Sequence, residues 1–144
     1  MTFRSLHAVP LLSLLSVLQP AGAAEIVVNV AGADSADGEI GCALYGGEEG
    51  FPMDASAATQ SWHPVLDGSA ECRFTGIEAG RYAVAVSHDL NGNRVTDTNL
   101  FGMPREAWGV SGNVRPKLRA PKFSEAAFDV AGDTVTRIDI RIER

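Results

Sequence analysis

The sequence predicts an all-β protein: an antiparallel β-sandwich of six to eight strands, immunoglobulin-like or transthyretin-like in its arrangement. Short apolar runs alternate with polar residues at the period of two that strands require. Turn dipeptides such as Asp67-Gly68 separate these runs. Helical patterns are few, and residues 90–122 show no sustained period. Because this segment holds large apolar residues, we expect one long ordered loop over one end of the sandwich.

The N-terminal residues predict export. Arg4 precedes the apolar run Val9–Leu18, and the small residues Ala21–Ala24 follow. This order is typical of a secretory signal peptide, so we expect residues 1–23 to be removed. Residues 24–144 should then fold as one domain, in the periplasm or outside a bacterial cell. The apolar run is too short to span a membrane, and no later segment approaches the required length of about 20 apolar residues.

The first four strands are predicted on either side of a weakly patterned loop. Glu25–Val30 and Gly38–Tyr45 place Ile, Val, Cys and Leu at alternate positions. Residues 48–60 are expected to form a loop with one helical turn. Trp62–Leu66 and Ala70–Phe74 then flank the Asp-Gly dipeptide, which is typical of two-residue turns. We therefore expect these two strands to pair as a hairpin.

Three more strands follow. Arg81–His88 alternates strictly after Gly80, and Ala126–Val130 and Thr136–Ile142 alternate around Gly132-Asp133. Large aromatic side chains dominate sandwich interiors. The sequence therefore places three aromatic residues in the core: Trp62, Phe74 and Tyr82.

The two cysteines, Cys42 and Cys72, both lie in predicted strands. In an oxidising compartment such a pair favours a disulfide bond. Two separate buried thiols are the alternative. A metal site is disfavoured because no Cys-x-x-Cys spacing or nearby histidine accompanies them.

The charge balance argues against nucleic-acid binding. The chain has a formal net charge of −6, whereas nucleic-acid-binding surfaces are basic. Between Thr98 and Ser124, however, Glu106 is the only acid, and the bases are Arg105, Arg115, Lys117, Arg119 and Lys122. Such a cluster could hold an envelope polysaccharide, a lipid headgroup or a protein. Alternatively, it is a solvated strip that pairs with the surplus acids.

Oxygen-bearing side chains at alternate positions indicate a calcium loop. With Asp89 as position one, Asn91, Asn93 and Asp97 fall at positions three, five and nine, and the carbonyl of Val95 falls at position seven. The match is partial, since arginine replaces the usual glycine at position six and position twelve lacks the bidentate glutamate. We expect weak calcium binding, in the range of roughly 10⁻⁴–10⁻³ M. Turn formation by the Asp and Asn side chains is the alternative.

The long segment also supplies the candidate ligand-binding residues. Its aromatic residues either pack beneath the loop or form an exposed binding platform beside the basic cluster. These candidates are Phe101, Trp108, Arg115, Lys117 and Arg119.

A second class of function is an envelope hydrolase or other enzyme that uses His88, Asp89 or Glu106. Neighbouring residues of a strand point to opposite faces, so His88 and Asp89 should not converge. We expect His88 to hydrogen-bond the long loop instead. No nucleophile, base and orienting group can be assembled from the sequence. A non-enzymatic binding module is therefore the favoured interpretation.

Two motifs resemble known families. The run Phe74-x-x-Ile77-x-x-Gly80-x-Tyr82 resembles the strand-entry motif of transthyretin-like and collagen-adhesin B-type sandwiches, whose tyrosine sits at the corner where the chain enters its strand. A longer motif resembles the bacterial exported family called domain of unknown function 2141. It runs from His88-Asp89-x-Asn91-Gly92-Asn93 to Phe101-Gly102-Met103-Pro104-x-Glu106-x-Trp108-Gly109. This resemblance implies a β-sandwich and an envelope or secreted location, and no particular activity.

Overall fold

The computed structural model describes residues 22–102 and 104–144. The predicted signal peptide, residues 1–23, lies outside the described residues except for its last two, and the first strand begins at Ala24. Within the described part of the chain no helix is long and apolar enough to cross a membrane.

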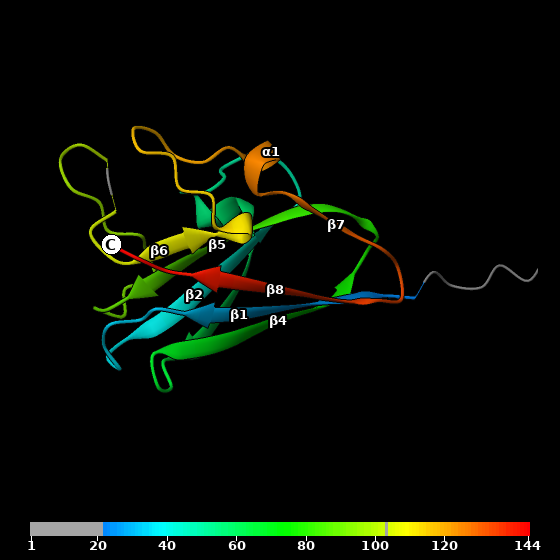
Figure 1. Ribbon diagram of the computed structural model, residues 1–144, viewed down its shortest axis with the longest axis horizontal. Coiled ribbons are helices and arrows are strands. Elements are labelled where there is room, and N and C mark those ends of the chain that lie inside the picture. Colours follow the sequence, from blue (N-terminus) through cyan, green and yellow to red (C-terminus); the bar gives the residue numbers. More distant parts are fainter. Residues whose placement is uncertain (1–21, 103) are drawn as a thin grey trace, which may run out of the picture.

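Eight strands form two sheets that pack face to face, as Figure 1 shows. One sheet has the order β4-β1-β8, and the other has the order β3-β2-β5-β6, with β7 also pairing with β5. The predicted sandwich is confirmed. The described strands are β1 (Ala24–Ala31), β2 (Glu39–Tyr45), β3 (Thr59–Pro64), β4 (Ser69–Ile77), β5 (Gly80–Asp89), β6 (Trp108–Val110), β7 (Phe128–Val130) and β8 (Val135–Arg141).

One strand pair is parallel, which residue alternation cannot reveal. Val28 of β1 lies opposite Ile138 of β8 in the parallel ladder and opposite Cys72 of β4 in an antiparallel one. The remaining ladders are antiparallel. Among the described residues, helix is confined to three short pieces: η1 (Ala55–Ala57), η2 (Ser111–Asn113) and α1 (Phe123–Ala126). The first of these fulfils the expectation of one helical turn before β3.

The predicted hairpin between β3 and β4 is wrong, although its turn is present. Leu66 and Ser69 exchange two backbone hydrogen bonds of 2.8 and 3.0 Å. Asp67 and Gly68 between them have φ values of 51° and 73°, as a two-residue hairpin turn requires. Yet β3 pairs with β2, whereas β4 pairs with β1 in the other sheet. A turn dipeptide reverses the chain locally and does not determine which sheet each strand joins.

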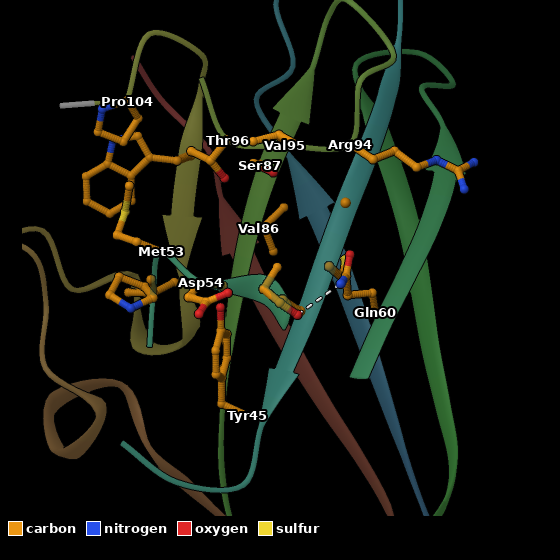
Figure 2. A pocket seen from close by; sticks show the side chains of 18 of the residues that line it. Tyr45, Met53, Asp54, Gln60, Val86, Ser87, Arg94, Val95, Thr96 and Pro104 are labelled. Atoms are coloured by element: carbon orange, nitrogen blue, oxygen red, sulfur yellow. Dashed lines mark hydrogen bonds between the residues drawn. The ribbon is translucent and has the colours of Figure 1, made fainter. Parts of the chain in front are cut away.

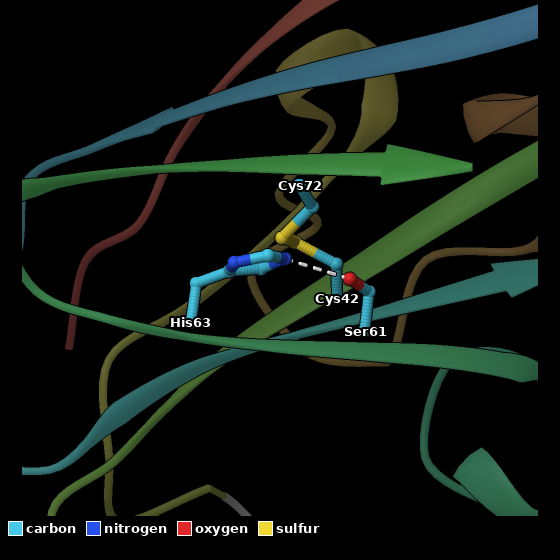
Figure 3. The surroundings of a disulfide bond; sticks show 4 residues. All are labelled: Cys42, Ser61, His63 and Cys72. Atoms are coloured by element: carbon cyan, nitrogen blue, oxygen red, sulfur yellow. Dashed lines mark hydrogen bonds between the residues drawn. A yellow bond between two sulfur atoms is a disulfide. The ribbon is translucent and has the colours of Figure 1, made fainter. Parts of the chain in front are cut away.

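The core lies between the two sheets and contains the predicted disulfide. Ile40, Cys42 and Leu44 point inward from β2, and Val84 and Val86 point inward from β5. The Cys42–Cys72 bond links the two sheets, with the Cα atoms 6.5 Å apart, and Figure 3 shows it at their interface. The disulfide prediction is confirmed. By restricting the unfolded chain, a bridge that closes a loop of this size stabilises the fold by about 3–4 kcal/mol.

Two of the three predicted core aromatics are correctly placed. Phe74 is buried, and Tyr82 packs against the same cluster. The Tyr82 hydroxyl donates a 3.0 Å hydrogen bond to the Glu78 carbonyl, at the corner where the chain enters β5. Trp62 is not a core residue, so that prediction is wrong. It belongs to β3, faces away from the core, and lines a pocket on the opposite face of the sheet.

The long segment is not a continuous loop, because β6 lies within it. Trp108 of β6 pairs with Ser87 of β5, and its backbone also exchanges hydrogen bonds of 3.0 and 3.1 Å with Glu143. Three residues that include a glycine are too few to show a period, which explains why the sequence did not reveal this strand. The chain on either side of β6 forms two projecting loops (Figure 1).

Candidate functional site

The outer face of the five-stranded sheet is floored by small residues. Because side chains alternate, residues that neighbour the core positions of β2 and β5 point away from the core. The strand register places Gly41 beside Ser87, and Ala43 beside Ala85. A tryptophan stands on each side of the first pair, Trp62 in β3 and Trp108 in β6. Small residues between large ones leave a pocket of about 300 Å³, called here the outer-face pocket.

Trp62 forms one wall of the pocket, and contacts with three residues hold its ring in place. Its ring lies over Gly41, where a Cβ atom would come within 2.4 Å of the ring, so a side chain at this position would displace the tryptophan. Its Nε1 donates a 3.3 Å hydrogen bond to Oε1 of Gln60. The Arg94 guanidinium lies 5.4 Å from the ring centroid and forms a 3.0 Å ion pair with Glu39. The Trp62 ring is therefore fixed by its neighbours.

Trp108 forms the opposite wall and is covered by Arg115. The guanidinium carbon of Arg115 lies 4.1 Å from the Trp108 ring centroid. The same guanidinium donates hydrogen bonds to the carbonyls of Trp108 and Glu143. Trp108 and Arg115, two of the predicted ligand-binding residues, are thus in contact. Arg115 holds the Trp108 ring in position beside the pocket.

Two loops raise the rim of the pocket, as Figure 2 shows. The loop between β2 and β3 contributes Pro52, Met53 and Asp54, and the loop after β5 contributes residues 94–96 and Pro104. The Asp54 carboxylate accepts hydrogen bonds from the side-chain hydroxyl and the backbone N–H of Ser56. These bonds lower the pKa of Asp54, so it is ionised at neutral pH. Asp54 forms no ion pair with any of the described residues.

A buried hydroxyl without a hydrogen-bond partner among the described residues belongs to Tyr45, which lines the pocket beside Asp54. Tyr45 is only 1% exposed, and no group among the described residues bonds its hydroxyl. Figure 2 shows this hydroxyl pointing toward Asp54. Burial, and secondarily the negative charge of Asp54, raises the pKa of Tyr45 to about 12. Buried polar groups are nearly always paired, so an unpaired donor beside a pocket points to a missing acceptor.

The predicted calcium loop is closed by its own hydrogen bonds. Asp89 accepts the backbone N–H of Gly92 at 2.9 Å through one oxygen and that of Arg94 at 2.6 Å through the other. Asn91 and Asn93 both donate to Asp97, at 2.6 and 3.3 Å, so the three side chains converge. Arg94 has a φ of 56°, the left-handed conformation for which glycine is usual at position six. The loop therefore has the turn geometry that is required both by a calcium site and by a simple turn stabilised by Asp and Asn side chains.

The described residues include no group of three or more His, Cys, Asp or Glu placed to hold a metal ion. The donor set at this loop is carboxylate and amide oxygen, which suits calcium rather than a transition metal. Calcium binding at Asp89, Asn91, Asn93, Val95 and Asp97 stays a prediction.

The residues considered for catalysis are buried apart from any open cleft. His88 is fully buried on the core side of β5, and its Nε2 lies 2.8 Å from the Asp37 carbonyl. His88 does hydrogen-bond the long segment as expected, but through its backbone N–H, which donates to the Ala107 carbonyl at 2.9 Å. Its side chain instead contacts Asp37 in the β1–β2 loop. Asp89 points to the other face, and Glu106 accepts the Leu90 N–H at 2.9 Å. Each of the three side chains bonds backbone groups.

The other predicted ligand-binding residues lie outside the pocket. Phe101 is 89% exposed in the loop after β5. Arg119 forms two hydrogen bonds of 2.8 and 2.7 Å with Glu125, as the alternative of paired surface charges suggests. Lys117 is exposed. Binding through the basic cluster stays a prediction that the pocket does not require.

Sequence reasoning missed the floor of the pocket and Tyr45. The available signal was the composition of Gly38–Tyr45 and Arg81–His88. Both faces of these strands carry apolar or small residues in place of the polar residues of a solvated face. Such strands are covered on both sides. The residues that point away from the core, such as Gly41, Ala43 and Ala85, are small, and their small size would have indicated a hollow on that face.

Comparison with known proteins gives one match. No curated protein and no solved structure matches the chain significantly. The model of the family described as "Uncharacterized protein conserved in bacteria (DUF2141)" matches residues 28–139, which span both sheets of the sandwich and include the outer-face pocket. The family is bacterial, and the disulfide is consistent with a compartment outside the cytoplasm. The chain belongs to the DUF2141 family.

Proposed function

We propose that the protein is an exported, non-enzymatic binding module whose ligand occupies the outer-face pocket. The observation that carries this proposal is the row of Trp62, Gly41, Ser87 and Trp108, which makes a recess between two fixed aromatic walls. Concave sites with mostly apolar walls and a few oriented polar groups are typical of small-molecule binding. Fixed walls lower the entropy lost when a ligand binds.

Substitution of the pocket floor tests the proposal. Ala85 is half-buried and lines the pocket, so Ala85→Phe should fill the recess. A collection of soluble sugars, amino acids and short fatty acids would be screened by ligand-observed NMR. We expect compounds that bind the wild type and lose binding in Ala85→Phe. The proposal is overturned if no compound binds, or if the compounds bind Ala85→Phe with the same affinity as the wild type.

A calcium ion in the Asp89–Asp97 loop would stabilise one rim of this pocket. The observation that favours it is that the loop brings Asn91 and Asn93 beside Asp97; their amide N–H groups donate to this carboxylate, so both amides must turn their oxygens toward an ion for it to bind. Carboxylate and amide oxygens have lone pairs beyond those used in the turn, so the same side chains could also coordinate an ion. Residues 94–96 belong both to this loop and to the pocket lining. Calcium would therefore order the rim without taking part in ligand contacts.

Calorimetry and thermal melts test the ion separately from the pocket. With a dissociation constant of roughly 10⁻⁴–10⁻³ M, millimolar calcium should give heat of binding and raise the melting temperature. Both effects should disappear in Asp97→Asn. They should persist in Asp67→Asn, a matched aspartate in the β3–β4 turn. If the wild type shows neither heat nor a shift, the loop is a turn only.

A further inference from the structure

The polar lining of the outer-face pocket identifies the class of ligand that it fits. The cation at the rim, Arg94, already pairs with Glu39. The charge that no ion pair balances is the carboxylate of Asp54. Among the described residues that line the pocket, no unpaired cation offsets this charge, because Arg115 lies on the Trp108 ring outside the lining and its guanidinium bonds two carbonyls. An anionic ligand would therefore be repelled by Asp54. This arrangement disfavours phosphates, carboxylates and anionic headgroups.

A purely apolar ligand is disfavoured as well. It would cover Asp54 and leave the Tyr45 hydroxyl without an acceptor in a drier environment. Burying an unsatisfied polar group costs about 1–3 kcal/mol, and more for a charged one. The occupant must therefore present hydrogen-bonding groups to Tyr45 and Asp54 and an apolar surface to the tryptophans.

A sugar ring meets both requirements. One side of a pyranose presents C–H groups, which pack against an indole ring as an apolar surface. Its hydroxyls both donate and accept, so a single sugar can accept from the Tyr45 hydroxyl and donate to the Asp54 carboxylate. Ser56, Ser87 and Thr96 add hydroxyl groups to the lining. The volume of about 300 Å³ is at the small end for ligand sites, which suits one sugar unit.

We propose that the outer-face pocket binds one unit of a neutral glycan, with its ring between Trp62 and Trp108 and its hydroxyls on Tyr45 and Asp54. This inference rests on the proposed function and specifies its ligand. The buried hydroxyl of Tyr45 provides evidence independent of the pocket walls, because folding alone leaves it unpaired. Met53 belongs to the rim of the pocket and is 40% exposed, so its flexible side chain can move as the sugar enters.

Tryptophan fluorescence gives a direct readout, since the chain has two tryptophans and both line the pocket. The probes are the methyl glycosides of glucose, N-acetylglucosamine and mannose, with decanoate as an apolar, anionic control. We expect at least one glycoside to change the emission with saturation, whereas decanoate does not. Tyr45→Phe, which removes one hydroxyl, should weaken that glycoside by about threefold to tenfold. Tyr82→Phe, whose hydroxyl bonds Glu78 outside this pocket, should bind as the wild type does.

The outcomes separate this inference from the proposed function. If decanoate binds between the tryptophans and no glycoside does, the pocket is a ligand site but the sugar assignment is overturned. Glycoside binding that Tyr45→Phe leaves unchanged overturns the assignment of the hydroxyl contact. If neither class of probe binds, the sugar inference fails, and the broader screen against Ala85→Phe decides the function.

Discussion

The two faces of the five-stranded sheet come from the same strands and differ in what their residues do. On the inner face, Ile40 and Val84 are fully buried between the sheets. On the outer face, Gly41 and Ala85 leave space that two tryptophans enclose but do not fill. Burial of apolar volume explains the inner face as part of folding. A recess with fixed walls has no such explanation, so the outer face is where function is to be sought.

Shortening one side chain on each face should give the largest difference in the free energy of unfolding. Ile40→Ala removes a fully buried side chain and leaves a cavity, so it should lower the free energy of unfolding by about 2–5 kcal/mol. Ser87→Ala on the outer face should change it by less than about 0.5 kcal/mol. Urea denaturation of both variants measures the difference. Equal losses would mean that the outer face is also part of the structural core.

Removing the disulfide should lower the stability of the fold and leave ligand binding at the outer face unchanged. Cys42→Ala/Cys72→Ala should lower the free energy of unfolding by about 3–4 kcal/mol, because the unfolded chain gains conformational freedom. The wild type with reductant should approach the variant in the same denaturation assay. Ligand affinity of the folded fraction should stay the same, since the pocket walls belong to β3 and β6. A loss of affinity in the folded variant would show that the two faces are coupled.

The two tyrosines contrast a hydroxyl that has a hydrogen-bond partner with one that has none, and Tyr82 is also less buried than Tyr45. Tyr82→Phe loses the 3.0 Å bond to Glu78 and should cost about 0.5–1.5 kcal/mol. Tyr45→Phe loses no bond and removes a buried unpaired hydroxyl, so stability should be unchanged or slightly increased. Thermal melts of both variants test this. Marked destabilisation by Tyr45→Phe would reveal a structural partner and remove the argument for a ligand.

At neutral pH the smallest expected effect is that of Tyr45 ionisation, because it changes stability only above about pH 10. Its pKa is about 12 in the folded protein, against an ordinary value of 10.0, so the folded state keeps this proton longer than the unfolded state. The stability due to this difference is complete below pH 10 and is lost as the pH rises toward 12. The melting temperature should fall more steeply over this range in the wild type than in Tyr45→Phe. Identical profiles would contradict the burial of the phenol.

The sequence predicted the features that depend on local pattern. Alternation identified the core strands β1, β2, β5 and β8, and the export context indicated the Cys42–Cys72 bond. The resemblance of residues 74–82 to a strand-entry motif also placed Tyr82 at the corner, where its hydroxyl bonds Glu78. Each of these depends on neighbouring residues or on one pair of unique side chains.

The features that the sequence did not predict depend on which strands meet. The Asp67-Gly68 turn is present, yet its flanking strands enter different sheets. The sequence does not show which face of β3 packs against the core. Trp62 was therefore wrongly predicted to be a core residue. The pocket requires β3, β2, β5 and β6 to lie in that order, and this order is a property of the topology. Only the pairing of small residues with tryptophans across these strands creates the site.

The most direct test of the central claim uses the indole N–H resonances of the two tryptophans in ¹H–¹⁵N spectra. The titrant is whichever methyl glycoside or decanoate binds the wild type, with the Ala85→Phe variant as control. The claim that the outer face is the binding face predicts that both indole peaks shift with saturation in the wild type and stay in place in Ala85→Phe. Binding that leaves both indole peaks unshifted would place the ligand elsewhere and contradict the claim.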